Sequence, residues 1–381
     1  NAQQRARQAK KREDPDVRDK ENARKRLRHR ARQAKKREAP DVSTLRNEPG
    51  ELRMANIAMH CKFEMATEKG SDDMRDRDEN GRHYLGRMDV RWLFVLFSAH
   101  TRVFLCSRDL QRGEEARSSL VEECGDEGRV QLVQLDVTDS DSVEACADLV
   151  RKRLEGRKLT GIVSNAGILW GYPLPELIDV CATGVKRVLD SFVPLIEDDG
   201  RVVVVTSGLG PLIHSYASEE RKTALLDDAS TWDERIAPMI DECIGAFGSS
   251  DTLEGRISAF ESIGFPGGPF AESAPDFHMY GIAKAFGDAE MIRVARRNPQ
   301  LRVTSVDPGL VYSDLILRMP KYAGLRQDET SAASPKEGVE AAMRLLFDDV
   351  GDGETSGNLY AINKQGELVH SSIDKMPQKQ E

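Results

Sequence analysis

Cysteine, histidine and long apolar runs are scarce in this chain of 381 residues. The six cysteines include no CxxC pair and have no histidines at the spacing of metal ligands, so no metal site is expected. Reduced thiols in a cytoplasmic protein are the simplest interpretation of them. No apolar run approaches the roughly 18 to 20 residues that cross a membrane, and no membrane partner is expected.

Acidic residues are few near the start of the chain. Residues 1–46 hold 17 Lys and Arg against 7 Asp and Glu, although the whole chain has a net charge of −9. The sequence RARQAKKRE occurs twice there, at 5–13 and 30–38. Because this segment has too few apolar residues to bury a core, we interpret 1–46 as a basic extension that is disordered or partly helical. Nucleic-acid binding is the alternative, but the aromatic residues of a stacking surface are missing, and no nucleic-acid partner is expected.

From residue 92 onward, short β-branched apolar runs alternate with helical stretches. Unbroken apolar runs are typical of strands that are buried on both faces. The alternation predicts an α/β fold with a doubly wound parallel sheet, which is a Rossmann-type, three-layer α/β/α domain over residues 92–374. The expected strands are Arg102–Cys106, Val130–Asp136, Gly161–Ser164, Arg201–Thr206, Arg302–Val306 and Asn358–Ile362; the expected helices are Leu110–Cys124, Ser140–Leu154, Glu176–Leu195, Tyr280–Arg297 and Pro335–Phe347.

Small and polar residues follow the expected strands, at the sheet edge where such folds bind ligands. Taken singly, these motifs have ordinary explanations, such as a turn or a helix cap. Tyr280 and Lys284, at the start of a long helix, are separated by four positions and therefore share one helix face. The motifs after the strands are Asn165–Ala166–Gly167, Thr206–Ser207 and Asp307–Pro308–Gly309.

In this order, the motifs resemble those of the short-chain dehydrogenases/reductases, and specifically the NADPH-dependent carbonyl reductase branch. The resemblance extends from about Val103 to Val369 and includes Ser107–Arg108–Asp109 and Asp136–Val137. It implies an oxidoreductase that reduces a ketone, aldehyde or quinone to the alcohol, with NADPH as cofactor and a small carbonyl compound as substrate.

The resemblance assigns catalytic roles to Ser207, Tyr280 and Lys284. Tyr280 is the expected acid, and the positive charge of Lys284 is expected to lower its pKa. Ser207 is expected to hold the carbonyl oxygen beside the Tyr280 hydroxyl. Lys284 is also expected to bind the nicotinamide ribose.

Cofactor preference is predicted from the end of the second strand. Arg108 follows Ser107 there, and a guanidinium suits the 2′-phosphate of NADPH; an ordinary surface arginine is the alternative. Asp136 resembles the residue that contacts adenine, with Val137 packing on the ring, although Asp136 could equally be a turn residue. The other expected cofactor-binding residues are Asn165, Ala166, Gly167, Tyr280, Lys284, Pro308 and Gly309.

Two features depart from the family pattern. The first strand and its Thr-Gly-x-x-x-Gly-x-Gly turn should lie about 20 to 30 residues before Val103, but only Gly86 falls near an expected glycine, and no apolar strand precedes it. Residues 47–91 are therefore either a polar linker or a divergent first βα unit. Cys181 stands where the family usually has an asparagine. A non-catalytic binding protein with an incomplete cofactor site is the competing hypothesis.

Ser207 and Tyr280 are 73 positions apart. The length resembles the helical insertion of carbonyl reductases, here at about 208–279, which covers a surface that other members use to form oligomers. A monomer is therefore expected. His278 is interpreted as a loop residue, with a place in the pocket as the alternative.

Overall fold

The computed structural model describes residues 55–60, 102–227, 229–348, 356–363 and 366–371. The interpretation of residues 1–46 as a basic extension, and any phosphate-binding turn within 61–101, lie outside the described residues.

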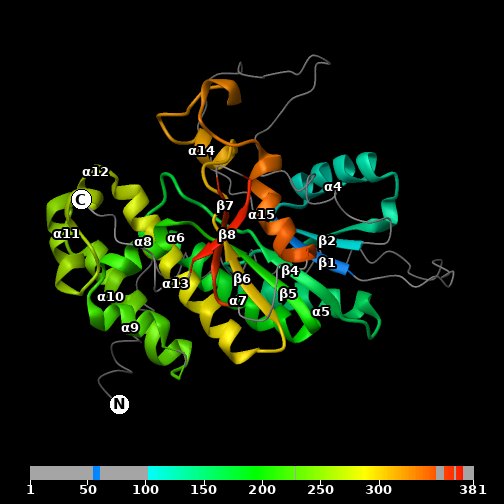
Figure 1. The fold of residues 1–381 in the computed structure, drawn as a ribbon, viewed down its shortest axis with the longest axis horizontal. Coiled ribbons are helices and arrows are strands. Elements are labelled where there is room, and N and C mark those ends of the chain that lie inside the picture. Colours follow the sequence, from blue (N-terminus) through cyan, green and yellow to red (C-terminus); the bar gives the residue numbers. More distant parts are fainter. Residues whose placement is uncertain (1–54, 61–101, 228, 349–355, 364–365, 372–381) are drawn as a thin grey trace, which may run out of the picture. The chain divides into compact units, whose positions relative to one another are not determined.

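An eight-stranded sheet forms the centre of the described part (Figure 1), in the order β3-β2-β1-β4-β5-β6-β7-β8. Neighbouring strands from β3 through β7 are parallel, and β8 is antiparallel to β7. This strand order is that of a Rossmann-type doubly wound sheet, and it confirms the expected fold class. The strands are β1 (Ala55–His60), β2 (Arg102–Ser107), β3 (Val130–Gln134), β4 (Leu159–Ser164), β5 (Ile196–Val205), β6 (Arg302–Val306), β7 (Leu359–Ile362) and β8 (Leu368–Ser371).

Strand β1 corrects the expectation that no strand precedes Gly86. It pairs with β2 on one side and with β4 on the other, in the middle of the sheet. Its sequence, ANIAMH, is short and contains Asn56 and His60, so it does not have the unbroken apolar character that marks the other strands. β1 lies within residues 47–91, for which a polar linker or a divergent first βα unit was predicted.

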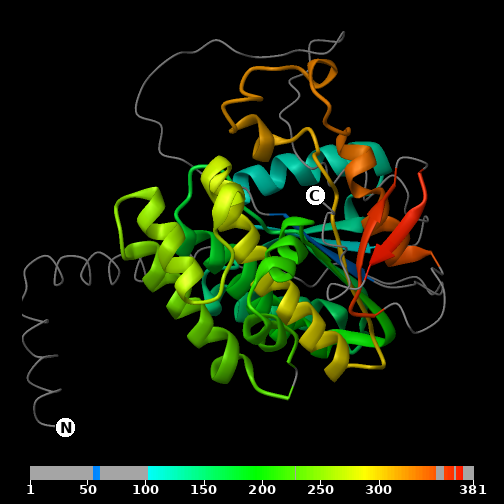
Figure 2. The same ribbon diagram turned by 60° about the vertical axis from the view of Figure 1, so that its left-hand side comes forward.

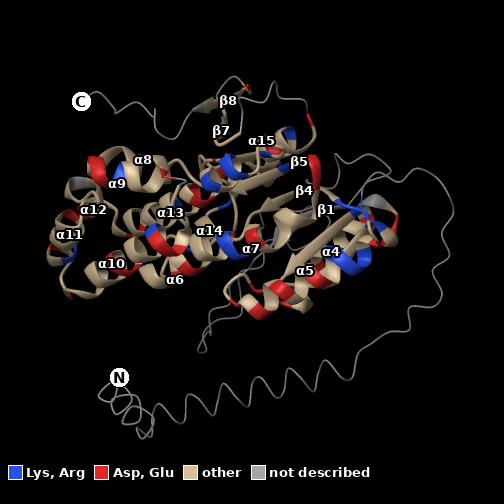
Figure 3. Ribbon diagram, turned by 90° about the horizontal axis from the view of Figure 1, so that it is seen from below, with Lys and Arg blue, Asp and Glu red and all other residues tan. Residues whose placement is uncertain are grey.

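Helices cover both faces of the sheet, as the three-layer prediction requires. Along β2, Val103 and Leu105 pack with α4 (Leu110–Cys124) and α15 (Pro335–Phe347), whereas Phe104 and Cys106 belong to the core on the other face. That second layer contains α5 (Ser140–Leu154), α6 (Leu174–Ile178), α7 (Gly184–Phe192) and α13 (Pro275–Arg297). In Figure 3, charged residues lie mainly along the helices, and the charged residues of β2, β5 and β6 lie in the first part of each strand.

The helix expected at Glu176–Leu195 is interrupted. Between α6 and α7 the chain forms a π-helical turn, η2 (Asp179–Thr183), and α7 continues into the 3₁₀ turn η3 (Val193–Leu195). A π turn admits an extra residue in the helix and moves the side chains on either side of it around the axis. Cys181 lies in η2 and is fully buried.

The segment between Ser207 and Tyr280 is folded as helices that gather beside α13 (Figure 2). Their buried side chains, including Trp232, Cys243 and Phe260, belong to the same core as Phe286 of α13. These helices are α8 (Leu209–Tyr216), α9 (Glu219–Leu226), η4 (Trp232–Ile236), α10 (Ala237–Gly248), α11 (Leu253–Ser262) and α12 (Gly268–Ser273); the remaining elements are η1 (Glu127–Arg129), α14 (Asp314–Leu317) and η5 (Gln327–Glu329). Within the described ranges, no helix combines the length and the apolar character of a membrane span.

Close contact between α13 and η2 depends on Gly287. A methyl group on Gly287 would lie 2.5 Å from the Cys181 carbonyl oxygen. We predict that Gly287→Ala lowers the free energy of unfolding by about 1–3 kcal/mol, because α13 must move away from η2. Gly245→Ala is the control, since no described residue outside the adjoining helix backbone lies within 4 Å of a methyl group there, and this exposed helix position should gain roughly 0.5–1 kcal/mol. Urea unfolding measures both; equal stabilities of the two variants would contradict the prediction.

Candidate active site

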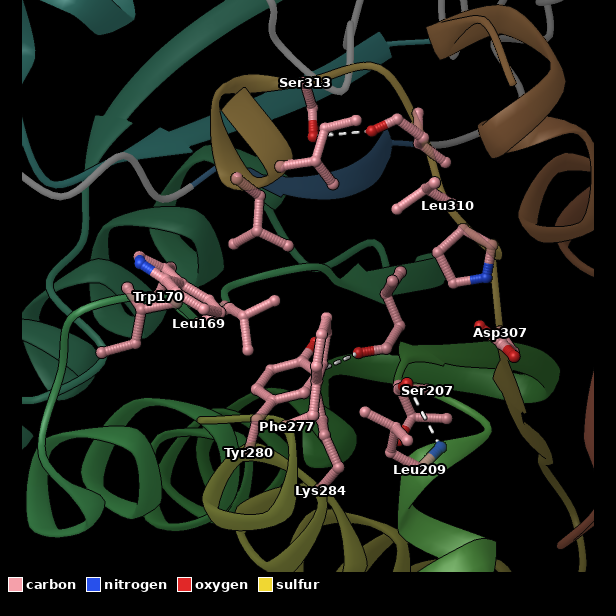
Figure 4. Close-up of a pocket in the computed structure, with 18 of the residues that line it drawn as sticks. Leu169, Trp170, Ser207, Leu209, Phe277, Tyr280, Lys284, Asp307, Leu310 and Ser313 are labelled. Atoms are coloured by element: carbon pink, nitrogen blue, oxygen red, sulfur yellow. Dashed lines mark hydrogen bonds between the residues drawn. The ribbon is translucent and has the colours of Figure 1, made fainter. Parts of the chain in front are cut away.

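A cavity of about 530 Å³ opens at the carboxyl ends of β4, β5 and β6. The turns after these strands and the first half of α13 provide its polar groups (Figure 4). Parallel strands place their carboxyl ends at one edge, so motifs far apart in the sequence meet there. The predicted site residues that line this cavity are Asn165, Gly167, Ser207, Tyr280, Lys284, Pro308 and Gly309.

Tyr280 and Lys284 lie on one face of α13 and point into the cavity (Figure 4). The helix begins at Pro275, so Tyr280 is in its second turn and not at its start as expected. The Lys284 ammonium is 3% exposed and donates a hydrogen bond of 2.9 Å to the Val205 carbonyl oxygen at the end of β5. Its Nζ atom is 5.5 Å from the centre of the Tyr280 ring.

The pKa of Tyr280 is not lowered as expected. Burial raises the pKa of Tyr280 to about 12, and the opposing effect of the Lys284 charge is smaller. Burial acts to lower the pKa of Lys284, but its interactions with Tyr280, Cys181 and Asp288 outweigh burial and leave that pKa above the ordinary value. Both side chains are therefore protonated near neutral pH, which is the form an acid needs.

Ser207 is half-buried at the end of β5. Its Oγ atom accepts a hydrogen bond of 3.3 Å from the Leu209 N–H, which leaves the hydroxyl hydrogen available to another acceptor. Figure 4 shows Ser207 and Tyr280 lining the same part of the cavity from opposite elements.

Asn165 and the glycines shape the polar wall. The buried Asn165 Oδ1 atom has no hydrogen-bond partner within the described residues, a state that usually indicates a bound water or ligand. Gly309 has a φ of +68°, in the left-handed region. A methyl group on Gly167 would lie 3.9 Å from Lys284 Nζ. Ala166, also expected at the site, is buried in the core behind the cavity.

Arg108, Asp136 and Val137 do not line this cavity. They follow β2 and β3, and since β1 separates β2 from β4, Arg108 is about 10 Å along the same edge from the end of β4. Asp136 Oδ1 accepts hydrogen bonds from the N–H and hydroxyl of Thr138, as a turn residue does. Val137 is 2% exposed. Their roles at a cofactor remain predictions.

The apolar wall was not predicted from the sequence. Trp170 and Phe277 meet edge to face across 6.4 Å. Phe277 precedes Tyr280 by three positions, so helical spacing could have found it. Arg318 adds a cation, whose Nη1 donates to the Tyr172 hydroxyl at 2.8 Å. The other large apolar residues of this wall are Ile168, Leu169, Leu209, Phe270, Leu310, Leu315, Ile316 and Met319.

Cys181 and His278 are buried neighbours of the site. The Cys181 thiol donates to the Ile168 carbonyl oxygen at 3.6 Å. His278 is in neither of the expected places: it is a helical residue of α13, 3% exposed, and Nε2 lies 2.6 Å from the Pro266 carbonyl oxygen. It therefore holds the turn before α12 against α13.

Several known proteins are similar to this chain in sequence. A family model described as short chain dehydrogenase matches residues 93–219. (+)-Neomenthol dehydrogenase of Arabidopsis thaliana is 29% identical over 281 residues, which cover 66% of this chain and 85% of that protein. Carbonyl reductase (NADPH) 1 of Homo sapiens is 28% identical over 283 residues, 70% of this chain and 88% of that protein.

Two solved structures share the fold. Salutaridine reductase from Papaver somniferum superposes with a TM-score of 0.57 at 20% identity, over 81% of this chain and 99% of that one. Menthone neomenthol reductase from Mentha piperita gives a TM-score of 0.53 at 22% identity, over 72% and 94%.

Burial lowers the pKa of His278, so its imidazole is neutral in the folded chain near pH 7. A lowered folded pKa gives stability that is present above the unfolded pKa and lost as the pH falls. We predict that His278→Phe, which keeps the ring contacts with Phe260 and Phe270, is less stable than the native chain by about 1 kcal/mol at pH 8. This difference should shrink between pH 7 and pH 5. Urea unfolding at several pH values tests this; a difference independent of pH would show that His278 does not titrate as described.

Proposed function

We propose that this chain is a short-chain dehydrogenase/reductase that reduces a small-molecule ketone, aldehyde or quinone to the alcohol with NADPH. The observation that carries the proposal is the meeting of Ser207, Tyr280 and Lys284 at one cavity. The name of the human relative, carbonyl reductase (NADPH) 1, supports the choice of reaction and cofactor.

Tyr280 is the proposed acid. Its phenol is protonated near neutral pH, because its pKa is about 12, and it donates to the carbonyl oxygen as negative charge develops there. The Ser207 hydroxyl donates to the same oxygen, and two fixed donors stabilise the developing alkoxide. Lys284, held by the Val205 carbonyl, keeps a positive charge beside the phenol. When bound, NADPH supplies the hydride.

The described residues fit a nicotinamide cofactor. Asn165 Oδ1 is a buried acceptor with no partner in the described part of the chain, and Gly167 and Gly309 carry no side chain that would fill the space beside the turns. We assign the nicotinamide end to Asn165, Ala166, Gly167, Tyr280, Lys284, Pro308 and Gly309, and the adenosine end to Arg108, Asp136 and Val137.

The cavity favours an apolar carbonyl substrate. Trp170 and Phe277 place aromatic faces beside the polar groups, and most of the remaining wall is aliphatic. Burial of apolar substrate surface supplies binding free energy, while the few polar groups orient the carbonyl.

We further infer a cytoplasmic monomer. Cys146, Cys181 and Cys243 are buried and free of disulfides in the described part of the chain, which suits a reducing compartment. The helices between Ser207 and Tyr280 pack in the same core as α13, and the resemblance to carbonyl reductases implies that they cover a surface that other members use to form oligomers.

A non-catalytic binding protein is the second candidate, because Cys181 is engaged with the Ile168 carbonyl and offers little to a proton relay. Titration with NADPH followed by a turnover assay separates the two candidates. Binding without turnover of any carbonyl compound would support the second.

We predict that Tyr280→Phe lowers kcat/KM for carbonyl reduction by about 10²- to 10⁴-fold, because the acid is lost and the ring is kept. NADPH oxidation is followed with menthone, acetophenone and menadione as probes. Tyr216→Phe is the control, since Tyr216 is 53% exposed. Turnover by Tyr280→Phe at the level of the control would remove Tyr280 from the mechanism.

We predict that Arg108→Ala raises KM for NADPH about 10- to 100-fold and leaves KM for NADH unchanged, because a charge-assisted bond to the 2′-phosphate is lost. Arg117→Ala, which removes a surface ion pair with Glu114 on α4, is the control. If Arg108→Ala changes KM for NADPH and KM for NADH equally, then Arg108 does not bind the 2′-phosphate.

A further inference from the structure

A buried carboxyl group that has no hydrogen-bond partner among the described residues lies behind the proposed site. Asp288 is 1% exposed and follows Lys284 by one turn of α13. Neither of its carboxyl oxygens makes a hydrogen bond within the described residues. An unpaired buried carboxylate is costly, so such a group is expected to be protonated, to hold a water, or both.

The surroundings of Asp288 connect it to Lys284. A methyl group on Gly210 of α8 would lie 2.1 Å from Asp288 Oδ2 and 3.2 Å from the Lys284 carbonyl carbon, so α8 closes this space from one side. The Thr206 hydroxyl, next to the carbonyl that holds Lys284, is near enough to act on the pKa of Asp288, although neither group makes an aligned hydrogen bond. The charged groups that face Asp288 are Lys284 on its own helix and Asp307 after β6.

The proposed reaction requires that Lys284 receive a proton in each turnover. Each reduction takes one proton from Tyr280, and the Lys284 ammonium beside it is the nearest source. Lys284 must then be protonated again. Cys181, a second acidic group near Lys284, is directed to the Ile168 carbonyl oxygen.

We propose that Asp288 resupplies the proton that Lys284 gives to Tyr280 in each turnover, with the Thr206 hydroxyl as the bridge. This inference rests on the proposed function. The Tyr280 O–H proton moves to the carbonyl oxygen, and a Lys284 N–H proton moves to the phenolate. The Asp288 carboxyl proton passes to Thr206 Oγ1 as the Thr206 proton passes to Lys284 Nζ. The Asp288 carboxylate finally takes a proton from water, so one solvent proton is consumed per alcohol formed. Asp288 acts through Lys284 and is a positioning residue, not a catalytic one.

The acidity of the groups agrees with this direction of transfer. Burial raises the pKa of Asp288 to about 7, against the opposing effects of the Thr206 hydroxyl and the Lys284 charge, while Asp307 raises it further. The pKa of Lys284 lies above its ordinary value. The directions of these two pKa shifts favour proton transfer from Asp288 to a neutral Lys284 amine.

The decisive variant is Asp288→Asn, which keeps the shape and removes the acid. With saturating NADPH and the best of the three probes, kcat of the native chain should fall as the pH rises through 7. Asp288→Asn should lower kcat about 10-fold at pH 6, abolish that pH dependence, and leave KM within twofold. Thr206→Val should lower kcat by a similar factor but should keep the pH dependence, because Asp288 can still titrate.

Glu290→Gln is the matched control, because Glu290 is a buried carboxyl on the same helix that pairs with Arg293 outside the cavity. It should keep the native pH profile. If Asp288→Asn has the same kcat and pH profile as the native chain while Tyr280→Phe is inactive, the role of Asp288 is overturned. The proposed function then remains intact. Absence of turnover in the native chain would overturn both.

Unfolding gives a readout that needs no cofactor. A folded pKa above the unfolded value gives stability that is present at low pH and lost as the pH rises through the folded pKa. The urea midpoint of Asp288→Asn relative to the native chain should therefore rise between pH 4 and pH 7 and level off above pH 8. A relative midpoint that does not change with pH would show that Asp288 holds no proton near neutral pH and would overturn the proposal.

Discussion

A lysine ammonium is buried at the carboxyl end of β5, and most features of the site follow from accommodating it. Lys284 is 3% exposed and uses one donor on the Val205 carbonyl. A buried charge is tolerated only where polar partners replace water. The phenol of Tyr280 and the carboxyl of Asp288, one turn before and one turn after it on α13, provide this environment. The groups that stabilise the ammonium are thus the same groups that can exchange protons with it.

Close packing of α13 makes this arrangement possible. Glycines let its neighbours approach: Gly287 admits the π turn that contains Cys181, and Gly210 admits the Asp288 carboxyl against α8. With side chains at these positions the helix would stand farther from the sheet. The same packing removes water from Tyr280, and for that reason burial outweighs the lysine charge and the pKa of the phenol rises. Expecting the pKa to fall was reasonable from spacing alone, but spacing carries no information about desolvation.

The extent to which the sequence predicts the molecule differs from one part to another. The parallel strands other than β1 and the two helical layers were predictable, because strands buried on both faces appear in the sequence as unbroken apolar runs. β1 was missed, since a six-residue strand with Asn56 and His60 has no such run, and its place between β2 and β4 is decided by backbone pairing. His278 was predicted to lie in a loop, but it is a helical residue whose contact is the Pro266 carbonyl, twelve positions earlier. A contact between such distant positions leaves no local pattern in the sequence.

The sequence by itself determined which chemical groups stand at the carboxyl ends of the strands. Asn165, Ser207 and Pro308 each lie two positions after the last apolar residue of a run. Tyr280 and Lys284 share a helix face through their spacing. Only the tertiary structure decided that these groups open onto one apolar cavity, with Trp170 and Phe277 as its wall. It also decided that Asp288 lies behind Lys284 with no hydrogen-bond partner in the part of the chain that the structure describes. The physical reason is that helical and strand periodicity are local properties of the chain, whereas burial, and with it every shifted pKa at this site, depends on which distant segments exclude water.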